Sequence, residues 1–490
     1  MPELFIFALP EMENAVVANI CRKGGVLDRI ARFDLCVPLL LGLVVFLICL
    51  FGILTRPVGF LAAIWPANAV LLGLMIRMPK SAGWQGWLAA AVAYMAADLL
   101  AGSTLEKAAL LNAANMAGVI AGYQVYKYLP AASSRLQHPA SLLHLAMVSA
   151  IASSVAGIVG GIANPILFGG SIFPGWIFWS TTELVNYISF LPVVLSAPKL
   201  DGIQTDFSVL ITRFRHEKWP PLVLLLVSCI AGALVGGPGA IAFPVPALLW
   251  CGLVYPVFPT SILTLCIGVW GLVILSNGLG DSSSLELDVM TLISIRLGIS
   301  LVALAPIMLS CVTQNRNALV GRLQYLASHD QLTNVLNRSA FREEAARRLA
   351  LGTSGFALLM VDLDDFKGVN DTHGHATGDT VLVNFVQRVK STLPSGSLLG
   401  RMGGEEFAVL IPDCRQVDAV AEAENIRQSV GTKPLPAGDG KEVQVTASLG
   451  VVAVEHGDPD SLDTLLAEAD RLCYLAKKRG RNRVEAAAET

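Results

Sequence analysis

Two glycines followed by two acids stand near the C-terminus of the chain, at residues 403–406. An apolar stretch upstream ends at Asp362, and a basic stretch covers residues 477–482 downstream. Glycines leave room where a ligand approaches the backbone, and Mg²⁺ binds one or two protein carboxylates together with phosphate oxygens. Together these parts could hold a nucleoside triphosphate and its metal ion. Taken alone, the glycine–acid motif is also compatible with a tight turn that carries solvated acids.

The pattern around these residues predicts the elements that position them. Strands are expected at residues 356–361, 398–402, 407–411 and 443–454, and helices at 376–393, 416–430 and 461–479. This is a mixed α/β domain in which Asp362, at a strand end, and Glu405, at a hairpin tip, meet at one edge of a sheet. The prediction fails if the two acids lie on opposite edges, or if either is buried in an ion pair of its own.

Further motifs give this domain a family resemblance. They follow one another along the chain at Asp330–Arg338, Asp362–His375, Gly378–Asp379, Gly403–Phe407 and Ala476–Asn482. In this order and spacing they resemble the GGDEF family of diguanylate cyclases, over about residues 325–486. The resemblance implies a ferredoxin-like or palm-like α/β fold, and the condensation of two GTP molecules into cyclic di-GMP and two pyrophosphates. It also implies Mg²⁺ or Mn²⁺ as cofactor and a homodimer in which each subunit presents one GTP.

The same resemblance implies a role for each matching residue. Glu405 and Glu406 match the catalytic acids, and Glu405 would help to activate the attacking 3′-hydroxyl. The implied metal ligands are Asp362, the backbone carbonyl of Leu363, Glu405 and Glu406. The implied guanine-binding pair is Asn370 and Asp379. The implied phosphate-binding residues are Asp365, Phe366, Gly403, Gly404, Lys477 and Arg481.

The chain departs from the family pattern at several positions. Asn334-Val335 stands where the opening motif usually has Gly-Leu, and we expect activity to survive this change. Glu405 replaces the Asp of the motif, which is a common active variant. Pro394 and Ser397 occupy the positions of an Arg-x-x-Asp inhibitory site, so no product inhibition through that site is expected.

Composition separates this domain from the rest of the chain. Of 490 residues, 54% are hydrophobic and 15% are charged, and the apolar ones concentrate between about residues 35 and 311. The net charge of −3 and the lack of a long basic face argue against a nucleic-acid partner. The predicted organisation is an N-terminal arm at 1–34, an integral membrane domain at 35–311, a helical connector at 312–329 and the α/β domain at 330–486.

Ten apolar segments approach the roughly 20 residues that a helix needs to cross a bilayer. They lie at about 35–55, 59–76, 85–101, 108–126, 142–163, 175–196, 220–236, 240–255, 259–276 and 289–311. Basic residues concentrate in the N-terminal arm and in every second connection, which places both termini in the cytoplasm. Eight spans are the alternative if 220–236 and 240–255 form a re-entrant hairpin. We therefore expect a multi-pass protein of the bacterial cytoplasmic membrane, in contact with the lipid bilayer.

Residues 64–69, Ile-Trp-Pro-Ala-Asn-Ala, resemble the membrane-associated sensor (MASE-type) domains that precede bacterial signalling enzymes. Asp98, Glu183 and Asn186 fall within or beside apolar segments, where polar groups usually face a cavity or a partner. One hypothesis is a sensory pocket for an unknown small molecule or membrane signal. The alternatives are hydrogen bonds that fix one helix to another, and a transporter.

The connector carries an apolar stripe at spacings of seven, four and three, made by Val312, Leu319, Leu323 and Leu326. Such a stripe forms a short parallel coiled coil between two protomers, or the buried face of a helix that packs on its own domain. At the level of function, the first hypothesis is an active membrane-bound diguanylate cyclase controlled by its sensor. The second is an inactive GTP-binding domain that signals by contact.

Overall fold

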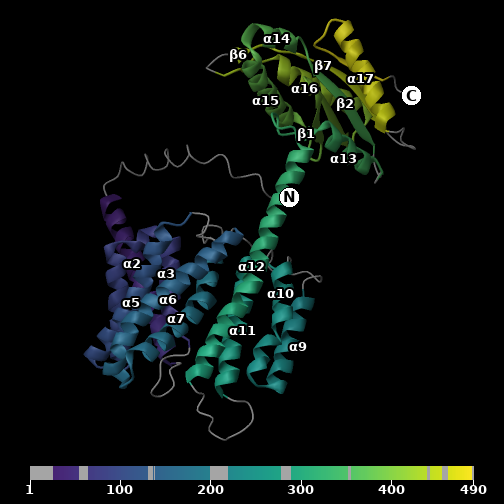
Figure 1. The fold of residues 1–490 in the computed structure, drawn as a ribbon. Helices are drawn as coiled ribbons and strands as arrows, with labels where there is room; N and C mark the ends of the chain where they lie inside the picture. Colours follow the sequence, from purple (N-terminus) through teal and green to yellow (C-terminus); the bar gives the residue numbers. More distant parts are fainter. Residues whose placement is uncertain are drawn as a thin grey trace. The chain divides into compact units, whose positions relative to one another are not determined.

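The computed structural model describes residues 26–54, 64–130, 136, 138–198, 219–277, 289–350, 355–438, 442–454 and 462–487. The chain divides into two compact units, Met1–Asn317 and Ala318–Thr490. The described part of the first unit is helical, whereas the second combines a sheet with helices (Figure 1).

The described part of the first unit contains long and short helices. The helices are α2 (Val26–Leu54), α3 (Ala67–Arg77), α4 (Trp84–Leu100), α5 (Leu105–Lys127), α6 (Pro139–Phe168), α7 (Ile172–Ser196), α9 (Pro220–Val235), α10 (Val245–Val254) and α11 (Val257–Asn277). Two short 3-10 helices, η1 (Pro79–Ala82) and η4 (Pro238–Ala242), lie among them. Helix α12 (Val289–Ser328) begins in this unit and continues into the second.

Within the described residues, three helical segments are long and apolar enough to cross a membrane: Val37–Leu54, Pro139–Phe168 and Ile293–Ser328. The predicted count of ten spans, or eight, is not confirmed. Helices α3, α9 and α10 have 11, 16 and 10 residues. At about 1.5 Å per residue, such helices fall short of a hydrocarbon core about 30 Å thick. Proline shortens two of the predicted segments: α3 begins after Pro66 within 59–76, and α10 begins after Pro244 within 240–255.

Helices α6 and α7 pack closely because glycines of α6 lie against large side chains of α7. A Cβ atom built on Gly160 would lie 2.2 Å from the indole ring of Trp179. One built on Gly161 would lie 2.9 Å from the backbone oxygen of Ile172. Small residues let helix backbones approach in this way, and such contacts are typical of membrane helix pairs.

The second unit is built on a six-stranded sheet in the order β1-β3-β4-β2-β7-β8. The strands are β1 (Leu336–Asn337), β2 (Phe356–Leu363), β3 (Leu398–Gly403), β4 (Glu406–Pro412), β7 (Ala447–Val454) and β8 (Val484–Ala486). Strand β2 pairs antiparallel with both β4 and β7, while β1 runs parallel to β3 and β8 parallel to β7. A second, two-stranded sheet consists of β5 (Leu435–Pro436) and β6 (Glu442–Val443).

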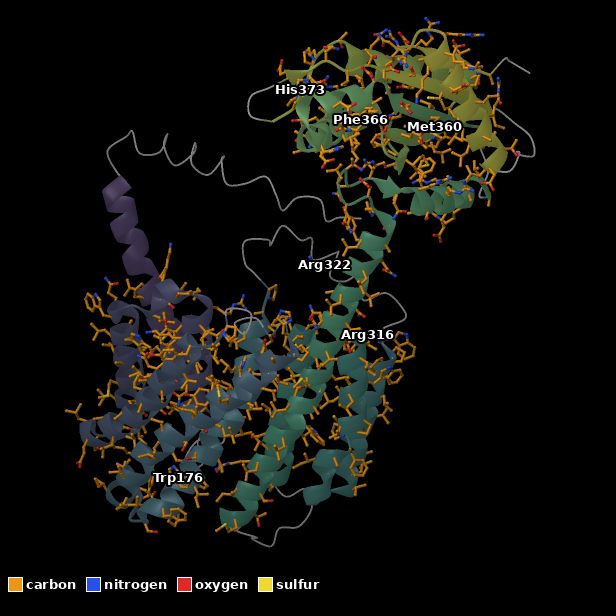
Figure 2. All side chains as sticks on the ribbon, turned by 45° about the horizontal axis from the view of Figure 1, so that its top comes forward. Trp176, Arg316, Arg322, Met360, Phe366 and His373 are labelled. Carbon is orange, nitrogen blue, oxygen red and sulfur yellow. The ribbon has the colours of Figure 1, made fainter. Side chains whose placement is uncertain are left out.

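Helices cover both faces of the large sheet: α13 (Arg338–Ala350), α14 (Phe366–His373), α15 (His375–Thr392), α16 (Gln416–Gly431) and α17 (Leu462–Lys478) surround it (Figure 1). Successive β2 residues alternate between the faces. Leu359 and Val361 belong to the core beneath α15 and α16, and Leu358 and Met360 to the core beneath α13 and α17. Met360 is labelled in Figure 2. Asp362 continues the second series and therefore falls on the α17 side.

The predicted elements of this unit agree with these bounds, except at the strand expected over 443–454. Only Ala447–Val454 joins the large sheet, whereas Glu442–Val443 pairs with Leu435–Pro436. The apolar run covers both segments because each has buried residues, Val443 on the small sheet and Ala447, Leu449 and Val451 on the large one. Sequence pattern alone does not show where a run changes its partner.

Candidate active site

Strand pairing brings the predicted acids together at one end of the sheet. Asp362 of β2 is the direct cross-strand partner of Glu406 in β4. The backbone N–H of Leu363 donates to the carbonyl of Glu405 at 3.4 Å. The side chain of Asp362 is buried, that of Glu405 is half-buried and that of Glu406 is exposed. The prediction that acids far apart in sequence meet at one sheet edge is therefore confirmed.

The turn between β3 and β4 depends on its two glycines. Gly404 has φ +51° and Gly403 has φ +159°, and a β-bulge lies between Arg401 and Gly403. The Gly404 value falls in the left-handed region, where glycine avoids the strain that a side chain would cause. A Cβ atom built on either glycine would meet nothing within 4 Å, so the backbone here is open to a ligand.

Arg401 anchors this turn, a role that the sequence did not predict. Its Nε and Nη2 atoms donate to the carbonyl of Gly404 at 2.9 and 2.7 Å. Its Nη1 atom bonds to Asp330, which also accepts from the N–H and hydroxyl of Thr333. Burial alone would raise the pKa of Asp330, but these hydrogen bonds and the Arg401 charge lower it. The start of the domain is thus tied to the turn that carries Glu405.

Asp362 forms an ion pair with Lys477 of α17, with 2.5 Å between Oδ2 and Nζ. Burial raises the pKa of Asp362 to about 6; Lys477 lowers it, and the charges of Glu405 and Glu406 raise it further. The pair is not a private one, since Lys477 is itself a predicted site residue and its side chain keeps 34% of its exposure. Asp362 is therefore not buried in an ion pair separate from the predicted site, which would have contradicted the prediction.

The acids fit a metal ion whose remaining ligands come from water and the substrate. Among the described residues, no group of three or more His, Cys, Asp or Glu side chains is arranged to hold a metal ion alone. Mg²⁺ does not require such a cage, since it commonly takes one or two carboxylates, water and phosphate oxygens. Asp362 and Glu406 on adjacent strands, with the Leu363 carbonyl beside them, supply a donor set of this kind.

Asp364 is a further positioning residue that the sequence reasoning missed. It is buried and accepts from the hydroxyls of Ser448 and Thr446, each at 2.7 Å. It also accepts from the backbone N–H of Asn482 at 3.0 Å, next to Arg481. The alternation of Asp362 and Asp364 along β2 and just beyond was the available signal, because such residues share a face.

The loop after α17 presents Arg481 in an unusual backbone conformation. Gly480, Arg481 and Asn482 have φ values of +112°, +60° and +46°. The N–H of Arg481 donates to the carbonyl of Ala476 at 3.1 Å, which closes the helix end. The side chain of Arg481 is exposed. Lys477 and Arg481 therefore lie at one helix end, as their spacing predicted.

The predicted guanine-binding residues lie on neighbouring helices. Asn370 is in α14 and Asp379 in α15. A Cβ atom built on Gly378 would lie 1.9 Å from Oδ1 of Asn370, so the absent side chain makes room for this amide beside Asp379. Asp365, with φ +53°, leads into α14, and the ring of Phe366 is buried (Figure 2).

Comparisons with known proteins agree with this geometry. Residues 327–483 match the family model described as "Diguanylate cyclase, GGDEF domain". Over 432 residues the chain is 30% identical to "Probable diguanylate cyclase DgcF" of Escherichia coli O157:H7, which covers 87% of this chain and 90% of that protein. The chain belongs to the GGDEF family of diguanylate cyclases.

Two further proteins are similar to this cyclase. The DgcF of Escherichia coli strain K12 is 36% identical over 309 residues, covering 62% of this chain and 95% of that protein. The crystal structure of the coiled coil and GGDEF domain of DgcB from Caulobacter crescentus in complex with c-di-GMP is 30% identical. It covers 36% of this chain and 94% of that chain, with a TM-score of 0.34.

The predicted sensory residues of the cyclase lie in a buried hydrogen-bond network of the first unit. Asn68 donates to Glu183 at 2.8 Å and to Asn115 at 3.0 Å, and accepts from Tyr94 at 2.6 Å. Asn115 donates to Asn112 at 3.2 Å, and Asn112 to Asp98 at 2.9 Å. The amide of Asn186 accepts from the N–H of Trp65 and donates to the carbonyl of Thr182.

This network joins α3, α4, α5 and α7, and its members are hydrogen-bonded mainly to one another. Such mutual bonding is what buried polar groups require when they fix helices to each other. The contacts favour the structural alternative for Asp98, Glu183 and Asn186 over a ligand pocket.

Proposed function

We propose that this chain is an active, membrane-bound diguanylate cyclase that condenses two GTP molecules into cyclic di-GMP and two pyrophosphates. The observation that carries the proposal is the convergence of Asp362, Glu406 and Lys477 from β2, β4 and α17. Three separate segments supply anionic and cationic groups to one sheet end, where the Gly403–Gly404 backbone is open. A tight turn with solvated acids would not need this arrangement.

Asp362, the Leu363 carbonyl, Glu405 and Glu406 would hold Mg²⁺ or Mn²⁺ in this proposal. Bound there, the ion would offset negative charge on the phosphate oxygens during in-line displacement. Metal ligation requires a deprotonated carboxylate, so the raised pKa of Asp362 makes binding pH-dependent near pH 6.

The remaining site residues would bind and orient GTP. Asn370 and Asp379 would read the guanine edge, since an amide and a carboxylate complement its O6 acceptor and N1/N2 donors. Lys477 and Arg481 would bind the triphosphate as cations. The backbone N–H groups at residues 365–366 and 403–404 would complete the phosphate contacts, because α14 begins at Phe366 and helix N-termini attract anions.

Glu405 would accept the proton of the attacking 3′-hydroxyl, with Glu406 beside it. Of the two, Glu405 is the half-buried one and Glu406 the exposed one. The assignment of the proton acceptor follows the match of Glu405 to the catalytic acid of the family motif. The hydroxyl comes from one GTP and the attacked α-phosphate from the other, so two subunits must face each other.

The connector supports a homodimer in this proposal. Leu319, Leu323 and Leu326 of α12 are 54%, 65% and 46% exposed. Their exposure favours a stripe that pairs with a second protomer over one that packs on its own domain. Arg316 and Arg322 lie on the same helix (Figure 2). The membrane unit, placed in the bacterial cytoplasmic membrane with both termini in the cytoplasm, would regulate how the two cyclase domains meet.

Turnover of GTP by the full-length protein in nanodiscs tests the proposal. We expect cyclic di-GMP from the wild type and from Glu343→Ala, an exposed acid of α13, but none from Glu405→Ala. GTP binding without product in the wild type, under every lipid condition, would instead identify an inactive GTP-binding protein. Comparable loss of GTP and ATP affinity in Asp379→Ala would contradict the guanine assignment.

A further inference from the structure

Arg296 is a buried cation within the candidate membrane span Ile293–Ser328 of α12. Only 5% of its surface is exposed. Its Nη1 atom donates to the hydroxyl of Thr182 at 2.6 Å, and its guanidinium lies 4.5 Å from the centre of the Phe178 ring. Both partners belong to α7. Arg296 is therefore held against α7 by one hydrogen bond and one aromatic contact.

Among the described residues, no anion faces the charge of Arg296. A guanidinium has five N–H donors and stays protonated in proteins. Among the described residues, Arg296 forms no ion pair, and its side chain makes the single hydrogen bond to Thr182. Burying a charge without a counter-ion is costly, and ionisable groups at membrane depth commonly mark ligand or ion sites. Glu183, by comparison, is hydrogen-bonded to Asn68 within a network of polar side chains.

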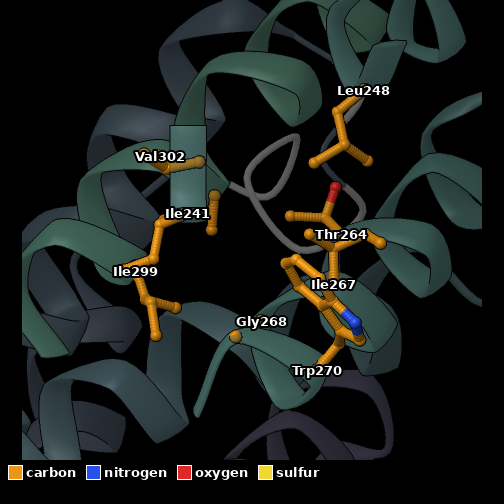
Figure 3. Close-up of a pocket in the computed structure, with 10 residues that line it drawn as sticks. Ile241, Leu248, Thr264, Ile267, Gly268, Trp270, Ile299 and Val302 are labelled. Carbon is orange, nitrogen blue, oxygen red and sulfur yellow. The ribbon is translucent and has the colours of Figure 1, made fainter. Parts of the chain in front are cut away.

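An apolar pocket begins one helical turn after Arg296 on the same helix. It is lined from α12 by Ile299, Val302 and Ala303, and from α10, α11 and η4 by Leu248, Thr264, Ile267, Gly268, Trp270, Gly271 and Ile241 (Figure 3). The empty space between these side chains is ≈ 320 Å³, part of it open to the surroundings. Gly268 and Gly271 contribute to this space because they carry no side chain there.

The two features lie along one helix pair. Ile299 packs with Val185 of α7, one turn beyond Thr182, and Gly268 lies near both Ile299 and Ser189 of α7. Helices α7 and α12 therefore run side by side from the Arg296 end to the pocket. A molecule with a negatively charged head and an extended apolar chain would match the Arg296 cation followed by the apolar pocket.

We propose that Arg296 and Thr182 bind the oxyanion head of a small amphiphile, a carboxylate or a phosphate ester, whose apolar chain enters the pocket. The charge-assisted hydrogen bonds of a guanidinium to an oxyanion supply affinity and orientation. The apolar chain gains by leaving water for the pocket. The site lies on α12, which continues to Ser328, so its occupant would act on the same helix that leads to the cyclase domain. The inference does not depend on catalysis.

Native mass spectrometry of the full-length protein counts bound molecules directly. Three probes distinguish the sources of the head group: dodecanoate, phosphatidylglycerol and inorganic phosphate. We expect the wild type to retain one dodecanoate or one phosphatidylglycerol per chain. Arg296→Gln should lower that occupancy at least about tenfold, because the charge-assisted bonds are lost. Arg296→Lys should restore part of it. Retention of inorganic phosphate alone would overturn the role of the pocket.

Two glycine variants test the apolar part. Gly271→Leu should fill the pocket and lower dodecanoate occupancy, since its Cβ would point toward Ile299 at 3.7 Å. Gly298→Leu is the matched control, because Gly298 is a helical glycine of α12 that does not line the pocket and meets nothing within 4 Å. Equal occupancy in the wild type, Arg296→Gln and Arg296→Lys would overturn the proposal, as would a wild type that binds neither amphiphile.

Discussion

Buried acids have opposite surroundings in the two units of this cyclase. In the first unit, Asp98 and Glu183 are separated by a chain of asparagine amides, and each accepts a hydrogen bond from one of them. In the second unit, Asp362 is the cross-strand partner of Glu406, feels the charges of both Glu405 and Glu406, and is paired with Lys477. The first arrangement satisfies its members, whereas the second keeps negative charges crowded together.

The difference distinguishes a structural network from a site prepared for a ligand. Saturated hydrogen bonds stabilise a particular helix arrangement and leave nothing for a partner to improve. Crowded acids cost stability until a cation binds, and strain of this kind concentrates at functional sites. Arg296 lies in the first unit but resembles the ligand site, because its charge is buried with one hydrogen bond among the described residues. The binding proposal therefore rests on Arg296.

The largest effect is expected from Asp362→Asn. Removing this carboxylate should lower cyclase turnover at least about 100-fold, because metal ions and their ligands supply several kcal/mol of charge stabilisation. The same variant should slow hydrogen exchange in β2 and β4, since repulsion from Glu405 and Glu406 is relieved. Asp371→Asn, an exposed acid of α14, is the control. Unchanged turnover in Asp362→Asn would show that the crowded acids of the second unit are not a ligand site.

Asn68→Ala should destabilise the first unit by about 3 kcal/mol, because Glu183, Asn115 and Tyr94 each lose a buried partner. Thermal unfolding followed by tryptophan fluorescence measures this unit selectively, since all 8 tryptophans lie between residues 65 and 270. Asn164→Ala is the matched control, because within the described residues Asn164 donates to the carbonyl of Ser171 near the surface. Equal shifts in both variants would show that the network contributes no special stability.

Asp364→Ala should lower kcat/KM for GTP about tenfold, because the loop that carries Arg481 loses its anchor at Asn482. The effect should fall mainly on KM, since Asp364 would act through a phosphate-binding residue and not on the reacting atoms. Asp470→Ala, an exposed acid on α17, should leave both constants unchanged. A fall in kcat alone would place Asp364 among the catalytic groups.

The smallest effect concerns pH. The pKa of Asp362 is raised to about 6 from an ordinary value of 3.8, so the folded state favours its protonated form. The associated stability is fully present below about pH 4 and is lost as pH rises through 6. Without metal, the protection of β2 and β4 amides, measured against the intrinsic exchange rate at each pH, should therefore fall over this interval. This change in protection should disappear in Asp362→Asn; if it persists, another group is responsible.

Local pattern predicted most of the second unit correctly. The buried run at 356–361, the glycine turn and the three helices follow from periodicity and turn chemistry, which depend on neighbouring residues. Asn334, where the family usually has Gly, has φ +57°, a conformation that asparagine tolerates better than most residues. The side chain of Asn334 accepts a hydrogen bond from the hydroxyl of Tyr325 in α12. This contact was not predictable, because no local sequence pattern indicates it.

The sequence by itself determined the division into an apolar and a soluble half, the order of the motifs and the family. Only the tertiary structure decided that Asp362 pairs with Glu406 and Lys477, that Asp364 holds the Arg481 loop, and which apolar segments form long helices. It also showed that, among the described residues, Glu183 joins a polar network through Asn68, whereas Arg296 is hydrogen-bonded to Thr182 in a mainly apolar setting. The reason is that hydrogen bonds and ion pairs between distant segments depend on strand register and helix packing, which composition and periodicity do not encode.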